Sequence, residues 1–132
     1  MGLNEIFEVS KPRIIILLVI TAVTSMYAGS KLVGPELSGL DILHIIIAGS
    51  LASAGSSALN HFYDKDIDLK MKRTSKRPIP SGRSKPTTVL IYGLSVSIIS
   101  VVYAALTLNY LCTFFIALGI FFYVIIYTVW LK

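Results

Sequence analysis

Three long uncharged runs constrain this chain more than any other feature of its sequence. Residues 14–30 and 42–63 contain no Asp, Glu, Lys or Arg, and neither do the 46 residues of 86–131. A helix needs about 20 apolar residues to cross a hydrocarbon core roughly 30 Å thick, so the last run is long enough for two crossings. Apolar residues make up 55% of the chain, well above the share in soluble domains. The sequence therefore predicts an all-α integral membrane bundle with four transmembrane helices.

The predicted spans follow from these runs and from the helix-breaking residues between them. We expect a single transmembrane domain over 1–132, with a short amphipathic lead-in over 1–10 that lies at the membrane surface. Asp41 is the expected N-cap of the second span, and Pro78 and Pro80 are expected to end its helical extension. The expected spans are about 12–29, 41–63, 86–106 and 111–131, with a polar loop over about 64–85.

The net charge of +5 comes from one polar stretch, Asn60–Pro86. That stretch holds three acidic and eight basic residues, while the four acids and four bases elsewhere cancel. In a four-span topology the basic residues before span one, those of the polar stretch and Lys132 fall on one side, and only Lys31 falls on the other. Basic residues in short loops mark the cytoplasmic side. We expect a multi-pass protein of the cell membrane with both termini and the polar loop in the cytoplasm.

Asn60, Asp64 and Asp68 are spaced i, i+4 and i+8. On a helix this spacing places them on one face, one turn or roughly 6 Å apart. Mg²⁺ usually takes one or two protein carboxylates and completes its octahedron with water and phosphate oxygens. We predict that Asp64 and Asp68 bind Mg²⁺, whereas Asp66 lies on the opposite face and is expected to be solvated or paired with a neighbouring lysine.

Basic residues follow directly after these acids. Arg73 and Arg77 are the candidates for diphosphate binding, because guanidinium groups bind phosphate through two parallel hydrogen bonds. For Lys70, Lys76 and Lys85 we favour topogenic charge and attraction to anionic lipid. Acids that hold a metal beside bases that neutralise phosphate are suited to a metal diphosphate. Membrane lipid is an expected partner, and nucleic acid is not.

Small and hydroxyl residues extend the same face back into span two. They are Gly49, Ser53, Ser56 and Ser57. Small residues allow helices to approach closely in lipid, so helix packing is one explanation. Their alignment with Asn60 indicates a second one, that they border a cavity below the acids.

Together these residues resemble the UbiA-type prenyltransferase superfamily, whose first acidic motif reads N-(D)-x-x-D-x-x-x-D. Asn60, Asp64 and Asp68 fill that motif here, and His61 stands in place of the bracketed Asp. This replacement resembles the protoheme IX farnesyltransferase branch. The short motifs that surround it in that branch are also present: Lys11-Pro12-Arg13, Met71-Lys72-Arg73-Thr74, Arg77-Pro78, Gly82 and Tyr127-Thr128.

The resemblance implies a nine-helix fold around a central cavity, of which this chain is the N-terminal portion. It implies Mg²⁺ as cofactor, farnesyl diphosphate as donor and haem B as acceptor, in the synthesis of haem O. Asn60, Asp64 and Asp68 are the implied catalytic residues, and Arg73 and Arg77 contact the diphosphate. A C-terminal half or a second chain then supplies a second acidic loop, and the 132 residues alone are expected to be inactive.

Two alternatives remain open. One is a UbiA-type enzyme that transfers its prenyl group to a quinone, chlorophyll or other lipid acceptor. The other is a non-catalytic membrane protein whose basic loop binds anionic lipid. The role of His61 is open in each case.

Overall fold

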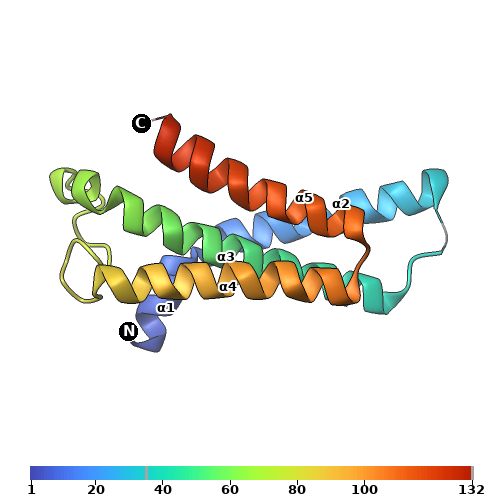
Figure 1. The fold of residues 1–132 in the computed structure, drawn as a ribbon, viewed down its shortest axis with the longest axis horizontal. Coiled ribbons are helices and arrows are strands. Elements are labelled where there is room, and N and C mark those ends of the chain that lie inside the picture. Colours follow the sequence, from blue (N-terminus) through green and yellow to red (C-terminus); the bar gives the residue numbers. More distant parts are fainter. Residues whose placement is uncertain (35, 132) are drawn as a thin grey trace.

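The computed structural model describes residues 1–34 and 36–131, apart from the side chain of Val33, and is helical almost throughout (Figure 1). A short helix, α1 (Leu3–Ser10), precedes α2 (Pro12–Val33) and the long α3 (Gly39–Lys70). After a polar connection over 71–85 come α4 (Pro86–Thr107), α5 (Tyr110–Phe121) and the π-helical η1 (Phe122–Trp130). Four helices, with α5 and η1 counted as one, are long and apolar enough to span a membrane. The predicted all-α membrane bundle is confirmed.

Helix ends differ from the predicted ones where side chains reach back to the backbone. Ser38, not Asp41, is the N-cap of α3: its hydroxyl accepts from the Leu40 N–H at 3.2 Å. Asp41 instead accepts from the Ser38 N–H at 3.3 Å, which completes a capping box. The same helix continues to Lys70, so the first residues assigned to the loop are helical, and it ends well before Pro78.

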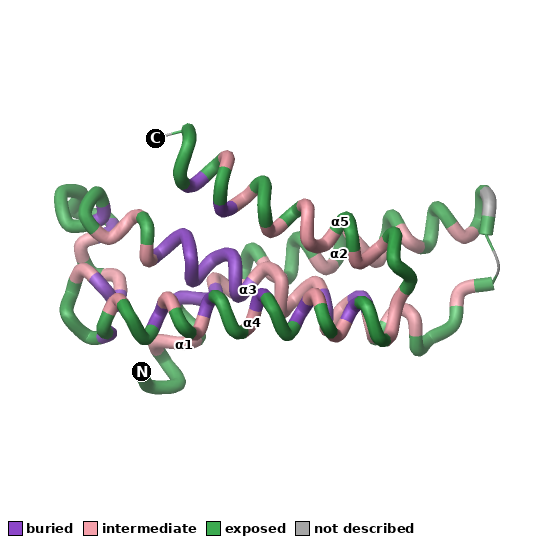
Figure 2. The backbone as a smooth tube through the Cα atoms, viewed as in Figure 1, coloured by how far each residue is buried: buried purple, intermediate pink, exposed green. Residues whose placement is uncertain are grey.

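Helix α3 is the centre of the bundle and packs against α1, α2, α4, α5 and η1. Residues 54–61 are buried in an unbroken run, which requires neighbours on every side of the helix. Figure 2 shows buried positions gathered along α3 and on α4. By contrast α2 exposes Ile16, Leu17 and Ile20, as expected for a helix in lipid.

Helices α3 and α4 approach each other closely at Gly55. A Cβ added there would lie 2.8 Å from the Ser97 backbone nitrogen and 2.9 Å from the Gly93 carbonyl oxygen. Below this crossing the Ser100 hydroxyl donates to the Ala48 carbonyl at 2.7 Å. Small-residue packing therefore operates through Gly55 and Gly93, as is common between helices in lipid.

We expect Gly55→Ala to destabilise the bundle by about 2 kcal/mol, because the new methyl meets backbone atoms that cannot move aside. Unfolding of the purified chain in detergent measures this effect. Gly49→Ala is the matched control, since a Cβ at Gly49 meets nothing within 4 Å. Equal stability of the two variants would contradict the close α3–α4 contact.

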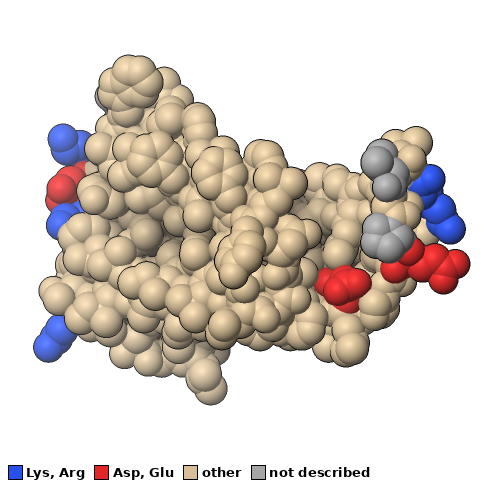
Figure 3. All heavy atoms as spheres, turned by 45° about the vertical axis from the view of Figure 1, so that its right-hand side comes forward, with Lys and Arg blue, Asp and Glu red and all other residues tan. Residues whose placement is uncertain are grey.

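Charge is segregated to the two ends of the molecule. On the face drawn in Figure 3, Lys, Arg, Asp and Glu lie at either end and the surface between them is uncharged. Helix α1, the connection 71–85 and the last turn of η1 lie at one end, which we call the polar end (Figure 1). Lys132, which the charge count assigns to this end, lies outside the described residues.

Helix α1 belongs to the packed structure of the polar end. Val9 is fully buried with Ala58, Ile79 and Val89. Glu8 accepts from Arg83 Nη1 at 2.9 Å, and the Ser84 hydroxyl donates to Glu5 at 2.9 Å. These bonds tie α1 to the end of the connection, while Leu3 and Phe7 stay exposed as the predicted surface-lying face requires.

Candidate active site

The last turns of α3 carry the predicted acidic face. Because the helix runs unbroken to Lys70, Asn60, Asp64 and Asp68 lie along one side of it at successive turns. Asn60 and Asp68 are buried, Asp64 is half-buried, and Asp66 is exposed. The structure thus brings the three predicted site residues together and leaves Asp66 outside, toward solvent.

Asn60 is the centre of a hydrogen-bond network that joins α3, η1 and the turn before α2. Its Nδ2 donates to Asp64 Oδ2 at 2.9 Å and to the Thr128 hydroxyl of η1 at 3.1 Å. Its Oδ1 accepts from Lys11 Nζ at 3.0 Å. Because both ends of the amide are engaged, its orientation is determined, and it holds one oxygen of Asp64 in place.

Asp68 forms an ion pair with Arg77, whose Nη1 lies 2.7 Å from Asp68 Oδ2. The Asp68 side chain is 6% exposed and the Arg77 side chain 25%. The connection folds back over the end of α3, because the Thr74 hydroxyl donates to the Asp68 carbonyl at 3.0 Å and Pro78 and Ile79 are buried. This fold-back delivers Arg77 to the acids, whereas Arg73 is exposed and remains a predicted phosphate contact.

An apolar cavity of about 360 Å³ lies between α2, α3, α5 and the start of η1. Ser56, one turn before Asn60, is in its wall, as are Gly49, Ser53 and Ser57. The rest of the wall is apolar or aromatic and includes Ile14, Leu18, Phe115, Ile116 and Tyr123. The prediction that the small-residue face of span two borders a cavity is therefore confirmed.

The donor set at the polar end suits Mg²⁺. Two carboxylates on one helical face leave most of an octahedron for water and substrate oxygens, which is the usual way that proteins bind this ion. No group of three or more His, Cys, Asp or Glu side chains that could enclose a metal occurs among the described residues. The arrangement fits a metal shared with a phosphate substrate better than a closed structural site.

His61 is 2% exposed, and neither of its ring nitrogens has a hydrogen-bond partner in the part of the chain that the structure describes. The hydroxyl of Ser57, one turn earlier, is also buried without a hydrogen-bond partner among the described residues. Buried polar atoms in native proteins nearly always have a partner. These two side chains therefore mark a place where water, substrate or another protein segment completes the hydrogen bonding.

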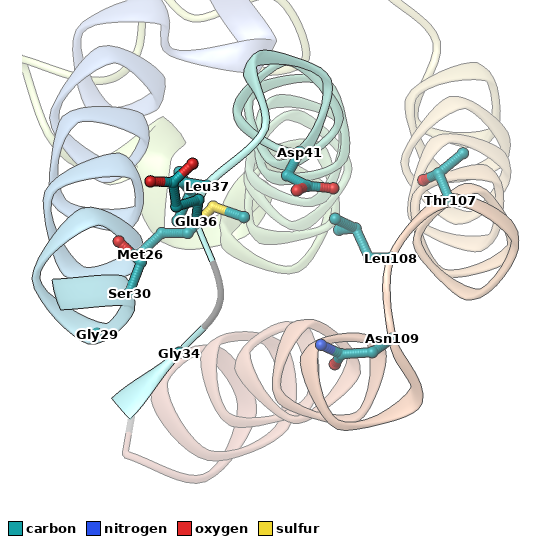
Figure 4. A pocket seen from close by; sticks show the side chains of 10 residues that line it. All are labelled: Met26, Gly29, Ser30, Gly34, Glu36, Leu37, Asp41, Thr107, Leu108 and Asn109. Carbon is teal, nitrogen blue, oxygen red and sulfur yellow. The ribbon is translucent and has the colours of Figure 1, made fainter. Parts of the chain in front are cut away.

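A second hollow, of about 480 Å³, lies at the opposite end of the bundle (Figure 4). Its polar side chains include Glu36, Asp41 and Asn109. Asp41 completes the capping box of α3, and Asn109 Oδ1 caps α5 by accepting from the Cys112 N–H at 2.7 Å. Two of these three side chains are therefore occupied in capping helices, and the described residues of this hollow form no group of site residues comparable with the acidic face of α3.

Residues 17–132 match the profile of the UbiA prenyltransferase family. The chain belongs to this family. It is 64% identical to protoheme IX farnesyltransferase 1 of Cenarchaeum symbiosum over all of this chain and 45% of the relative. It is 44% identical to protoheme IX farnesyltransferase of Ruegeria pomeroyi and 43% identical to that of Agrobacterium fabrum, in each case over 99% of this chain and 40% of the relative. No solved structure matches.

This UbiA family chain thus spans less than half the length of the curated relatives it matches. Its four apolar helices and its family together identify a multi-pass membrane protein. The predicted resemblance, including the protoheme IX farnesyltransferase branch, is confirmed.

Two residues of the Asn60 network in this UbiA chain were not predicted as site residues. In the sequence, Lys11 is interpreted as a topogenic charge and as part of a family motif, and Thr128 only as part of a family motif. Thr128 is 1% exposed, and its hydroxyl donates to the Tyr123 carbonyl at 2.8 Å within the π-helix η1. π-Helical turns are frequent at functional sites, but they have no reliable sequence signature. The long-range contacts to Asn60 could be seen only in the fold.

Proposed function

We propose that this chain carries the prenyl diphosphate site of a membrane farnesyltransferase that uses haem B as acceptor and makes haem O. The observation that supports this most strongly is the acidic face of α3, with Asn60, Asp64 and Asp68 in register, Arg77 beside it and an apolar cavity below. The names of the matched relatives favour the haem branch.

Each residue of the site has a role in this proposal. Asp64 and Asp68 would hold Mg²⁺, which would supply positive charge to stabilise the diphosphate as the leaving group. Asn60 holds Asp64 in the orientation that the metal needs, through its 2.9 Å hydrogen bond. Arg77 and Arg73 contact phosphate oxygens, and Arg77 can do so while it remains beside Asp68.

The apolar cavity receives the farnesyl chain, and the diphosphate stays at the polar end. Cleavage of the C1–O bond gives an allylic cation and a free diphosphate. A haem vinyl group attacks C1, and the cation left on the vinyl carbon is captured by water, which loses a proton. Few groups in the cavity wall could intercept the cation early, because the wall is predominantly apolar.

The acceptor and the topology are part of the same proposal. The excess of basic residues at the polar end supports a cytoplasmic location for the connection and both termini in the cell membrane. The matched relatives are more than twice as long as this chain, so a C-terminal half or a second chain completes the cavity. We infer that the 132 residues alone bind the donor but yield no haem O when haem B and Mg²⁺ are supplied; haem O formation would refute this inference.

Protection of the connection 71–85 from proteolysis distinguishes the proposed enzyme from a non-catalytic protein that recruits lipid. We expect farnesyl diphosphate to slow tryptic cleavage within 71–85 of the purified chain, because it holds Arg73 and Arg77. The protection should require Mg²⁺ and should disappear with EDTA. Protection by vesicles of anionic lipid alone, unaffected by Mg²⁺ and not increased by farnesyl diphosphate, would support the lipid-recruiting alternative.

A further inference from the structure

The turn between α1 and α2 contains an unusual backbone conformation. Lys11 has φ 52° and ψ 68°, and among the described residues it is the one non-glycine residue with positive φ. Left-handed geometry is costly for a residue with a Cβ, and glycine or asparagine normally fills such a position. Residues held in this region cluster at functional sites, so a lysine here calls for a functional explanation.

The residues before Lys11 are fixed by packing. Val9 is fully buried, and the Ser10 hydroxyl lies 3.0 Å from the Tyr92 hydroxyl of α4. Pro12 then begins α2 at once. The turn is thus fixed on both sides. Its Lys11 side chain extends toward α3, where Nζ lies 3.0 Å from Asn60 Oδ1.

This orientation of the side chain places the Lys11 ammonium beside the proposed metal site. Asn60 connects Lys11 to Asp64 through a single amide group, with hydrogen bonds of 3.0 and 2.9 Å. Asp64 and Asp68 would hold the metal that binds a diphosphate, and the Lys11 ammonium has three donors, of which Asn60 takes one.

The electrostatics of Lys11 are consistent with an anionic ligand. Burial and, to a smaller extent, the nearby Arg77 lower the pKa of the Lys11 ammonium to about 8, although Asp68 opposes the shift. At neutral pH the ammonium keeps its charge in surroundings that disfavour it, and a bound diphosphate would stabilise that charge. A role limited to holding Asn60 needs no charge, because any side chain with an N–H donor could fill it.

We propose that Lys11 is a further diphosphate-binding residue, whose ammonium fixes the Asn60 amide and contacts the phosphate oxygens beside Arg77. The inference rests on the proposed function and adds a contact from the α1–α2 turn, which is far from the acidic motif in sequence. Helix α1 then acts as the support that holds this residue in its left-handed conformation.

The test compares wild type, Lys11→Met and Lys11→Arg in lipid nanodiscs, with farnesyl diphosphate plus Mg²⁺ and with farnesol as probes. Lys11→Met should weaken farnesyl diphosphate binding by at least about tenfold, the loss of one charged hydrogen bond. Farnesol, which needs only the apolar cavity, should bind within about twofold of wild type. Lys11→Arg keeps the charge and should recover most of the affinity for the diphosphate.

Equal weakening for both probes, or no recovery in Lys11→Arg, would reduce Lys11 to a structural residue and overturn the inference. If wild type binds farnesyl diphosphate, Asp64→Asn does not, and Lys11→Met binds like wild type, the Lys11 inference fails and the proposed function stands. If wild type itself shows no Mg²⁺-dependent binding, the proposed function fails and takes this inference with it.

Discussion

Asp64→Asn should abolish Mg²⁺-dependent binding of farnesyl diphosphate. The asparagine side chain has the same shape but lacks the charge that binds the metal, and it places an amide where Asn60 Nδ2 now finds a carboxylate oxygen at 2.9 Å. Loss of a group that only orients a metal ligand typically costs 10–100-fold in metal affinity, so loss of a ligand should cost about 100-fold or more. Calorimetric titration of the chain in nanodiscs, with and without Mg²⁺, measures this loss.

Asp66→Asn is the matched control for this experiment. It removes the same charge from the same helix, but Asp66 is exposed and lies on the opposite face. We expect near wild-type affinity for farnesyl diphosphate in this variant. Equal losses of farnesyl diphosphate affinity in the two variants would show that binding depends on the total charge of the segment. They would contradict a metal site formed by one face of α3.

Arg77→Met should have the largest effect on stability. It leaves the Asp68 carboxylate, 6% exposed, without the guanidinium that lies 2.7 Å away. Breaking a buried pair typically costs 3–5 kcal/mol, and because Arg77 is a quarter exposed we expect about 3 kcal/mol. Denaturant unfolding of the chain in detergent gives this free energy.

Two further variants check the cause of that loss. Arg73→Met removes an exposed arginine of the same connection and should change stability by less than about 0.5 kcal/mol. In Asp68→Asn with Arg77→Met no charge is left unpaired, so about half of the stability should return. A double variant as unstable as Arg77→Met alone would show that Arg77 acts through packing and not through its charge.

Local periodicity was enough to predict the helices and the acidic face. Uncharged runs reveal apolar spans directly, and a spacing of four residues places Asn60, Asp64 and Asp68 on one side of any helix that contains them. The predicted helical extension with the acidic face is present, but α3 ends at Lys70, before the prolines that were expected to end it.

The contacts that complete the site could not be predicted in the same way. Lys11 is 49 residues from Asn60 in sequence and Thr128 is 68 residues away, so neither pairing has a local signal. The left-handed turn at Lys11 runs against the preference of its residue type. Similarly, the inward position of Arg77, in contrast to Arg73, depends on how the connection folds back on α3. Such features arise from tertiary packing, and the structure was needed to find them.

The central claim is that a metal ion joins the α3 carboxylates to a prenyl diphosphate. Mn²⁺ substituted for Mg²⁺ makes this directly visible, because electron–nuclear double resonance detects phosphorus nuclei bonded through oxygen to the ion. We predict protein-bound Mn²⁺ with a phosphorus coupling when farnesyl diphosphate is present, and loss of that bound species in Asp64→Asn. Farnesyl diphosphate that binds equally well in EDTA, or bound Mn²⁺ without phosphorus coupling, would contradict the claim.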